Sequence, residues 1–129
     1  MSRFQFLQLS LSALLLCFGG CSGGSSLDYG SVEGTVTLDG APLTQASVTF
    51  YPKSGERSST GETDENGKYS LRHTRAIRGA VVGEHTVTIS VAEDDKQKLP
   101  LKYGSRKQSD ETRTVEGGSN TIDLPLKSK

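Results

Sequence analysis

The chain has 129 residues, which is enough for one ordinary domain. Its 15 Lys and Arg residues balance 15 Asp and Glu residues, and this argues against a nucleic-acid binder, because such proteins carry a strong positive excess. Trp is absent and aromatic residues make up 6% of the chain, so there is little material for a surface that stacks on sugars or bases.

Residues 1–20 have the pattern of an export signal. Arg3 supplies their only positive charge, and a leucine-rich stretch follows from Phe4 to Phe18. Gln and Ser interrupt this stretch, and it is shorter than the roughly 20 apolar residues that a membrane-spanning helix needs. We therefore interpret residues 1–20 as a signal peptide that is not part of the fold.

Small residues then lead to a cysteine in the order Phe18-Gly19-Gly20-Cys21. This order resembles the bacterial lipobox, in which the cysteine thiol is acylated and the residue before the cysteine must be small. Gly20 meets that requirement, whereas Phe18 replaces the usual Leu or Val. The resemblance implies cleavage between Gly20 and Cys21 and lipidation of Cys21. Several acyl chains would make the membrane anchor stable, because one chain alone binds only marginally.

The cysteine count agrees with lipidation. Cys17 is the rival acceptor, but Leu16 before it is too bulky. If cleavage precedes Cys21, Cys17 leaves with the signal and Cys21 is consumed by lipid, so no thiol remains for a disulfide or a metal ion. The alternative is an ordinary signal peptide cleaved nearby, which would leave Cys21 as a free thiol.

Residues 21–29 are expected to form a lipidated, flexible tether. The segment Ser-Gly-Gly-Ser-Ser from Ser22 to Ser26 has the composition of a flexible linker. Ser22 also stands where an Asp would favour retention in the inner membrane of well-studied bacteria. We therefore expect the outer membrane rather than the inner membrane, with the domain in the periplasm or at the cell surface.

Alternating apolar and polar residues predict β-strands in the remaining segment, residues 30–129. The alternation is clear over 32–38, 46–51 and 84–91, and weaker strands are expected over 60–63, 69–71, 111–115 and 120–126. Asp39-Gly40 and Asn66-Gly67 predict tight turns, because Asn, Asp and Gly tolerate positive φ angles. Six or seven short strands with one buried face predict an all-β, antiparallel sandwich.

Seven motifs support a family assignment by their order and spacing. They are Val32-Glu33-Gly34-Thr35-Val36, Gly40-Ala41-Pro42-Leu43, Ala46-Ser47-Val48-Thr49-Phe50, Thr63 to Tyr69, Val82 to Ile89, Leu99 to Tyr103 and Ser119 to Leu124. Over about residues 30–127 the chain resembles the carboxypeptidase regulatory-like domains, a transthyretin-like (prealbumin-like) group, as found in short planctomycete lipoproteins. The resemblance implies a seven-stranded Greek-key sandwich. It implies little about activity, because function does not follow from fold.

The titratable residues predict neither a metal site nor a cofactor. His73 and His85 are the only histidines, and nothing in the sequence places a carboxylate or nucleophile beside either. His85 falls on the apolar face of its strand, so we expect it in the core. Asp64 begins a weak match to a calcium loop, but the twelfth position of that loop would be Arg75 instead of Glu, so we expect a hairpin turn there.

The segment from Glu93 to Lys107 is long and carries charges of both signs. A loop of this length in a small domain is a candidate recognition loop, although most such segments are solvated connections. The candidate contact residues are Lys98, Leu101, Lys102 and Tyr103. Tyr103-Gly104-Ser105 also resembles part of the terminal motif of the transthyretin-like hydroxyisourate hydrolases, but about two dozen residues follow it here and the intervening Arg is missing.

These features together predict a membrane-anchored exported lipoprotein whose sandwich is a non-catalytic binding or structural module at the cell envelope. Its partners would be the membrane, through the lipid anchor, and an envelope protein or polysaccharide. One alternative is an accessory subunit that assembles with another exported protein. A second alternative is a hydrolase of the transthyretin-like type, for which the sequence offers no catalytic set.

Overall fold

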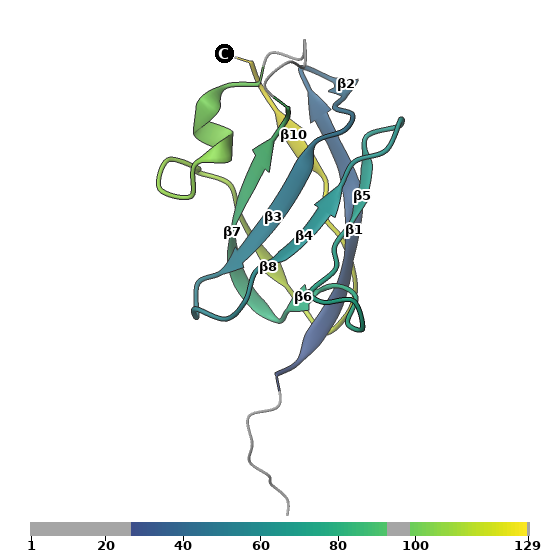
Figure 1. Cartoon of the computed structure of the whole chain (residues 1–129), viewed down its shortest axis with the longest axis vertical. Coiled ribbons are helices and arrows are strands. Elements are labelled where there is room, and N and C mark those ends of the chain that lie inside the picture. The colour runs from purple at the N-terminus through teal and green to yellow at the C-terminus, as the bar shows by residue number, and fades with distance from the viewer. Residues whose placement is uncertain (1–26, 93–98, 129) are drawn as a thin grey trace, which may run out of the picture.

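The computed structural model describes residues 27–92 and 99–128, which form two packed β-sheets (Figure 1). The first sheet is built around β1 (Tyr29–Leu38), which pairs with β2 (Ala41–Pro42), β5 (Lys68–Ser70), β6 (Ala80–Val81), β9 (Gly118–Thr121) and β10 (Leu124–Leu126). The second sheet has the strand order β4 (Ser59–Glu62), β3 (Ser47–Pro52), β7 (Gly83–Ser90) and β8 (Thr112–Val115). A 3-10 helix, η1 (Leu101–Gly104), lies between β7 and β8 in the chain.

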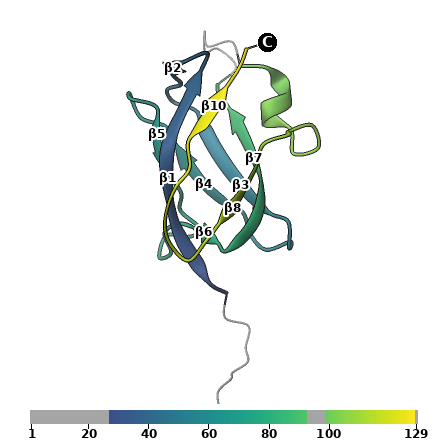
Figure 2. The ribbon, with the colours of Figure 1, turned by 180° about the vertical axis from the view of Figure 1, so that it is seen from behind.

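The all-β sandwich expected from the sequence is confirmed. Along β1, every second residue from Gly30 to Val36 is buried, and β3 buries Val48, Phe50 and Pro52 in the same way. Successive side chains of a strand point to opposite faces, so this alternation places one face of each sheet against the other. Figure 2 shows the two layers from the side of β1 and β10.

All seven expected strands are present. The described residues form ten strands instead of seven, for two reasons. The two-residue strands β2 and β6 were too short to produce a periodic signal. The last expected strand is divided into β9 and β10 by a break at Ile122 and Asp123. Both β9 and β10 run parallel to β1, so this sheet is mixed in direction, whereas all pairs in the second sheet are antiparallel.

The core lies between the sheets and contains most of the apolar side chains that the strand pattern assigned to it. Leu38, Val91 and Ile122 are only partly buried at its margin. Other buried side chains come from outside the clearly alternating segments: Leu43, Ala80, Val81, Tyr103 and Val115. His85 is fully buried in this core, as its position on the apolar face of the strand predicts.

The segment from Asp64 to Lys68 forms the expected tight turn. Gly67 has a φ of 77°, and its amide donates to the Asp64 carbonyl oxygen over 3.0 Å. One carboxylate oxygen of Asp64 accepts hydrogen bonds from the amides of Asn66 at 2.8 Å and Lys68 at 3.0 Å. The weak resemblance to a calcium loop therefore corresponds to a turn in which this carboxylate binds backbone amides.

These hydrogen bonds predict that the turn loses stability in acid. The amides of Lys68 and Asn66 lower the pKa of the Asp64 carboxyl below its ordinary value of 3.8. A carboxyl with a lower pKa in the folded state stabilises the fold above its unfolded pKa, and the contribution is lost as pH falls through the folded pKa. We expect Asp64→Asn to lower the urea midpoint at neutral pH, with the difference from wild type shrinking below about pH 4. A difference that stays constant across this range would contradict the prediction.

Candidate functional site

The predicted site residues fall into three groups: those outside the described residues, those that are exposed, and Tyr103, which is buried. Gly20, Cys21 and Lys98 lie outside the described residues, as does the tether segment from Ser22 to Ser26. Leu101 and Lys102 are exposed on η1, and the Leu101 side chain is 91% exposed.

Tyr103 is buried and has a structural role. Its hydroxyl donates to the carbonyl oxygen of Lys127 at 3.3 Å and accepts from the amide of the same residue at 3.2 Å. These bonds attach η1 to the chain just after β10. Of the four candidate contact residues, only Leu101 and Lys102 are therefore exposed within the described part of the chain.

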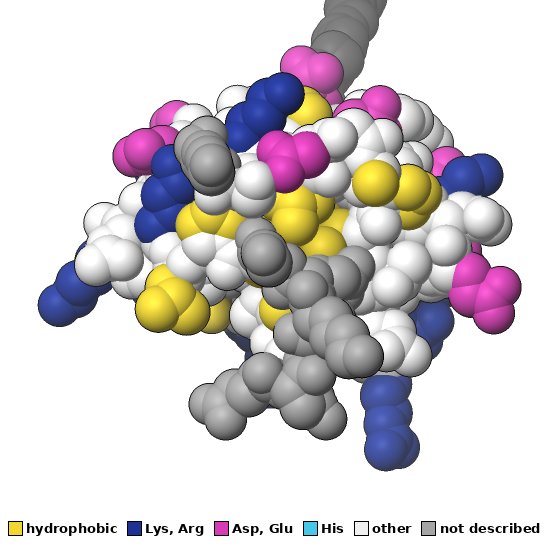
Figure 3. All heavy atoms as spheres, turned by 90° about the horizontal axis from the view of Figure 1, so that it is seen from above, with side chains coloured by type: hydrophobic (Ala, Val, Ile, Leu, Met, Phe, Trp, Pro, Cys, Tyr) yellow, Lys and Arg dark blue, Asp and Glu magenta, His cyan; other side chains and the backbone are white. Residues whose placement is uncertain are grey.

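A small apolar hollow of about 90 Å³ lies beside η1, lined by Ile89, Ser90, Val91, Leu99, Pro100, Leu101 and Gly104. This hollow is near the end of the sandwich opposite the start of β1. Figure 3 shows apolar side chains gathered at that end, with both basic and acidic side chains around them. Exposed apolar side chains at one place are a feature of contact surfaces.

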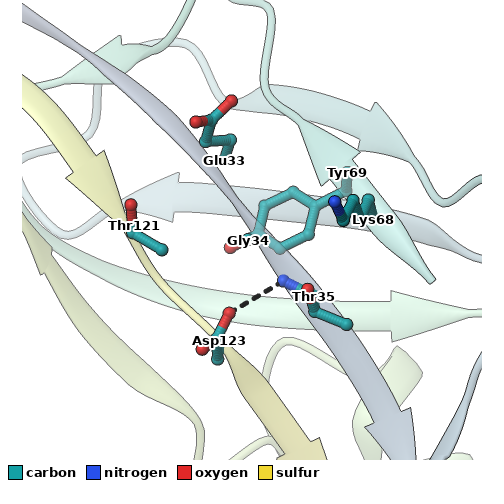
Figure 4. Close-up of a pocket in the computed structure, with 7 residues that line it drawn as sticks. All are labelled: Glu33, Gly34, Thr35, Lys68, Tyr69, Thr121 and Asp123. Carbon is teal, nitrogen blue, oxygen red and sulfur yellow. Dashed lines mark hydrogen bonds between the residues drawn. The ribbon is translucent and has the colours of Figure 1, made fainter. Parts of the chain in front are cut away.

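A polar groove of about 220 Å³ lies on the outer side of the first sheet (Figure 4). It is lined by Glu33, Gly34, Thr35, Lys68, Tyr69, Thr121 and Asp123. The Tyr69 hydroxyl donates to the Ile122 carbonyl oxygen at 2.5 Å, and the Thr35 amide donates to an Asp123 carboxylate oxygen at 2.9 Å. Both polar groups therefore hold the segment between β9 and β10 against β1.

The electrostatics of this groove agree with a structural role for Tyr69. Burial raises the pKa of its phenol well above the ordinary value, and the negative charge of Asp123 raises it further. The phenol therefore keeps its proton and acts as a hydrogen-bond donor. Gly34 forms the floor of the groove, where a Cβ atom would lie 1.9 Å from the Ile122 carbonyl oxygen.

A wider hollow of about 610 Å³ is formed by two loops that are distant in the chain. Residues 53–58 connect β3 to β4, and residues 71–79 connect β5 to β6. The lining side chains are basic or neutral: Arg57, Ser58, Thr60, Arg72, His73, Thr74 and Arg75. We call this hollow the arginine groove. Both loops lie toward the end of the sandwich where β1 begins (Figures 1 and 2).

The second loop is held in shape by local hydrogen bonds. The Thr74 hydroxyl accepts from the amides of Ala76 at 3.2 Å and Ile77 at 3.1 Å, and the His73 amide donates to the Ile77 carbonyl oxygen at 2.8 Å. Arg72 forms β-bridges to Thr60 and to Arg78, which fix its backbone beside β4. The guanidinium groups are thus carried by an ordered backbone.

His73 joins the arginine groove to the start of β1. Its Nδ1 atom lies 3.0 Å from the Ser59 hydroxyl, and its ring centroid is 4.9 Å from that of Tyr29. Burial lowers the pKa of His73, and the nearby charge of Arg57 lowers it further. The Ser59 side chain is fully buried, so its hydroxyl is not exposed to a substrate in this conformation.

Sequence reasoning did not identify the arginine groove, although a signal was available. From Tyr69 to Gly83 the chain contains three Arg residues and no Asp or Glu. Counting charge over short windows would have found this segment. Guanidinium groups bind phosphate and carboxylate oxygens through paired hydrogen bonds, so the chemistry offered here is anion binding.

Residues 27–92 and 99–128 contain no cluster of three His, Cys, Asp or Glu side chains able to hold an ion. Over the same residues, no helix is long and apolar enough to cross a membrane.

Comparisons with known proteins give only distant structural similarities. No protein-family model matches the chain, and a search of curated proteins finds no relative. The Bacillus anthracis TIE protein is 17% identical with a TM-score of 0.47, and the match covers 100% of this chain and 19% of that one. A DUF3823 family protein from Parabacteroides merdae is 15% identical with a TM-score of 0.46, and the match covers 78% of this chain and 46% of that one. This chain therefore spans less than half the length of either structure.

Proposed function

We propose that this chain is an exported lipoprotein, anchored by acyl chains on Cys21, whose β-sandwich is a non-catalytic binding or structural module at the cell envelope. The observation that carries the proposal is the arrangement of an export signal, a small residue before Cys21 and a Gly- and Ser-rich tether directly before the first strand. We assign the sandwich to the carboxypeptidase regulatory-like group, on the motifs from Val32 to Leu124. The absence of Asp after Cys21 favours the outer membrane.

A non-catalytic role is supported by how the polar side chains are used. In the polar groove, Tyr69 and Asp123 bind the backbone of neighbouring strands. In the arginine groove, the one histidine lies against the hydroxyl of a fully buried serine. These groups support the fold, and a catalytic site needs a nucleophile, base or acid that can reach a substrate.

A recognition role is favoured over simple assembly by the exposed apolar end. Leu101 is almost fully exposed beside the hollow that Leu99 and Pro100 also line. An apolar surface of this kind suits contact with an envelope protein or polysaccharide. Assembly with another exported protein as an accessory subunit is the alternative, and it would use a strand edge such as that of β8, which ends its sheet.

The decisive experiment is the intact mass of the protein extracted from membranes. We expect a chain that begins at Cys21 and carries acyl chains. Cys21→Ser should move the protein out of the processed, membrane-bound fraction, because serine offers no thiol for acylation. Cys17→Ser is the matched control and should leave mass and membrane association unchanged. An unmodified Cys21, or cleavage at another residue, would overturn the proposal.

A further inference from the structure

The arginine groove has no role in the proposed function, and it lies beside the start of β1. Tyr29 is the first residue of β1, and its ring contacts His73 in the lining of the groove. Gly30, the next residue, pairs with Ala80, which directly follows the arginine-bearing loop. The groove therefore lies where the chain enters the fold from the tether.

The length of the tether limits how far this groove can lie from the lipid. Tyr29 lies eight positions after Cys21 in the chain. Fully extended, this segment spans at most roughly 28 Å. If Cys21 is acylated as proposed above, the arginine groove is kept within this distance of the bilayer surface, and the effective concentration of headgroups around it is high.

The charges at this end are suited to an anionic surface. Arg57, Arg72 and Arg75 line the groove and are exposed, and no acidic side chain lines it. Of the acidic residues near this end, Asp28 and Glu116 are exposed, whereas Glu56 and Glu84 have partners in the structure. Glu56 accepts a hydrogen bond from Ser54, and Glu84 forms an ion pair with Lys53 at 3.3 Å.

We propose that the arginine groove docks the domain onto the anionic phospholipid headgroups of the membrane to which Cys21 anchors it. The guanidinium groups bind headgroup phosphates, and the tether supplies the proximity. Docking would fix the orientation of the sandwich, with the arginine end at the membrane and the apolar end beside η1 facing away from it. The inference rests on the proposed lipid anchor for this geometry.

The test measures binding without the lipid anchor, so that its outcome is independent of acylation. The segment from Ser22 to Lys129 with no acyl chain is suitable, because every core side chain lies between Val32 and Leu126. We expect it to cosediment with phosphatidylcholine vesicles that contain phosphatidylglycerol, and not with pure phosphatidylcholine vesicles. Binding should weaken strongly at about 0.5 M salt, where charges are screened.

Substitutions in the arginine groove test whether the groove is the part of the domain that binds the vesicles. Each Arg near an anionic membrane contributes about fivefold to binding, so Arg57→Gln, Arg72→Gln and Arg75→Gln together should lower it about 100-fold. The matched control combines Lys68→Gln, Lys102→Gln and Lys127→Gln, which removes the same charge from exposed sites outside the groove. This control should lower binding less than about threefold, because those lysines do not face the bilayer in the docked orientation.

A melting curve checks that each variant is folded. If the triple arginine variant is not, Arg57→Gln with Arg75→Gln tests the same inference, since both side chains are exposed in loops, and the expected loss is about 25-fold. Equal losses in the arginine and lysine variants, or equal binding to both kinds of vesicle, would overturn docking through the groove. Failure of the lipid anchor would appear separately, in the mass measurement.

Discussion

Gly34→Ala is expected to destabilise the domain by about 3 kcal/mol, at the upper end of the usual cost of overpacking. Gly34 lies in the middle of β1, where the backbone of the break between β9 and β10 crosses it. A Cβ atom would lie 1.9 Å from the carbonyl oxygen of Ile122 and 2.6 Å from its carbonyl carbon. Backbone atoms cannot move aside as a flexible side chain can, so the crossing segment itself must shift.

That shift should also loosen the polar groove, which gives the prediction a second readout. The Thr35 amide donates to Asp123 and the Tyr69 hydroxyl donates to Ile122, so both bonds depend on the position of the crossing segment. We expect faster hydrogen exchange at the Thr35 amide in the Gly34→Ala variant. For a domain of this size, the loss of stability corresponds to a fall in melting temperature of roughly 12 °C or more.

Gly117→Ala is the matched control. A Cβ atom at Gly117 meets nothing within 4 Å, and its φ is not in the left-handed region. Alanine there should be neutral or slightly stabilising, because it restricts the unfolded chain. If the two variants had the same urea midpoint, the close backbone crossing at Gly34 would be disproved.

His85→Ala is the second substitution with a large expected effect, about 3 kcal/mol of lost stability. The side chain is fully buried, and its ring centroid is 5.5 Å from that of Phe50. Its Nε2 atom lies 2.6 Å from the Val81 carbonyl oxygen, so this nitrogen carries the proton and donates to it. Alanine would leave a cavity between the sheets and an unpaired buried carbonyl.

His85→Phe separates packing from hydrogen bonding. Phenylalanine keeps an aromatic ring at this site, although a larger one, but cannot donate to Val81. It also removes Nδ1, a buried atom that has no hydrogen-bond partner among the described residues. We therefore expect His85→Phe to cost about 2 kcal/mol, less than alanine, because it leaves no cavity. Urea unfolding of both variants measures their free energies of unfolding. An equal loss of stability in the two would show that the hydrogen bond to Val81, and not the packing of the ring, determines the stability at this site.

Much of the fold could be predicted because its signals are local. The alternation along Val32 to Leu38 is set by the two-residue period of a strand, and it identified the buried face of β1 without knowledge of any neighbour. Asn66-Gly67 identified a turn because few residues adopt its backbone angles. The core position of His85 followed from the same period.

The candidate sites were harder to predict because they depend on contacts between distant segments. Tyr103 lies in a charged segment and was grouped with the recognition residues, yet it is buried because Lys127 comes to lie beside it. The arginine groove needs two distant segments, residues 57–60 and 72–75, which meet through a β-bridge between Thr60 and Arg72. No local pattern specifies such a pairing.

By itself, the sequence determined the strand class, the buried face of each long strand and the tight turns, because these follow from the chemistry of neighbouring residues. Only the tertiary structure decided three features. They are the parallel pairing of β9 and β10 with β1, the close contact of the Ile122 backbone with Gly34, and the arginine groove at the start of β1. Each of these depends on contacts between residues that are far apart in the chain. Hydrophobic periodicity predicts which residues are buried, but it does not predict which segment packs against them.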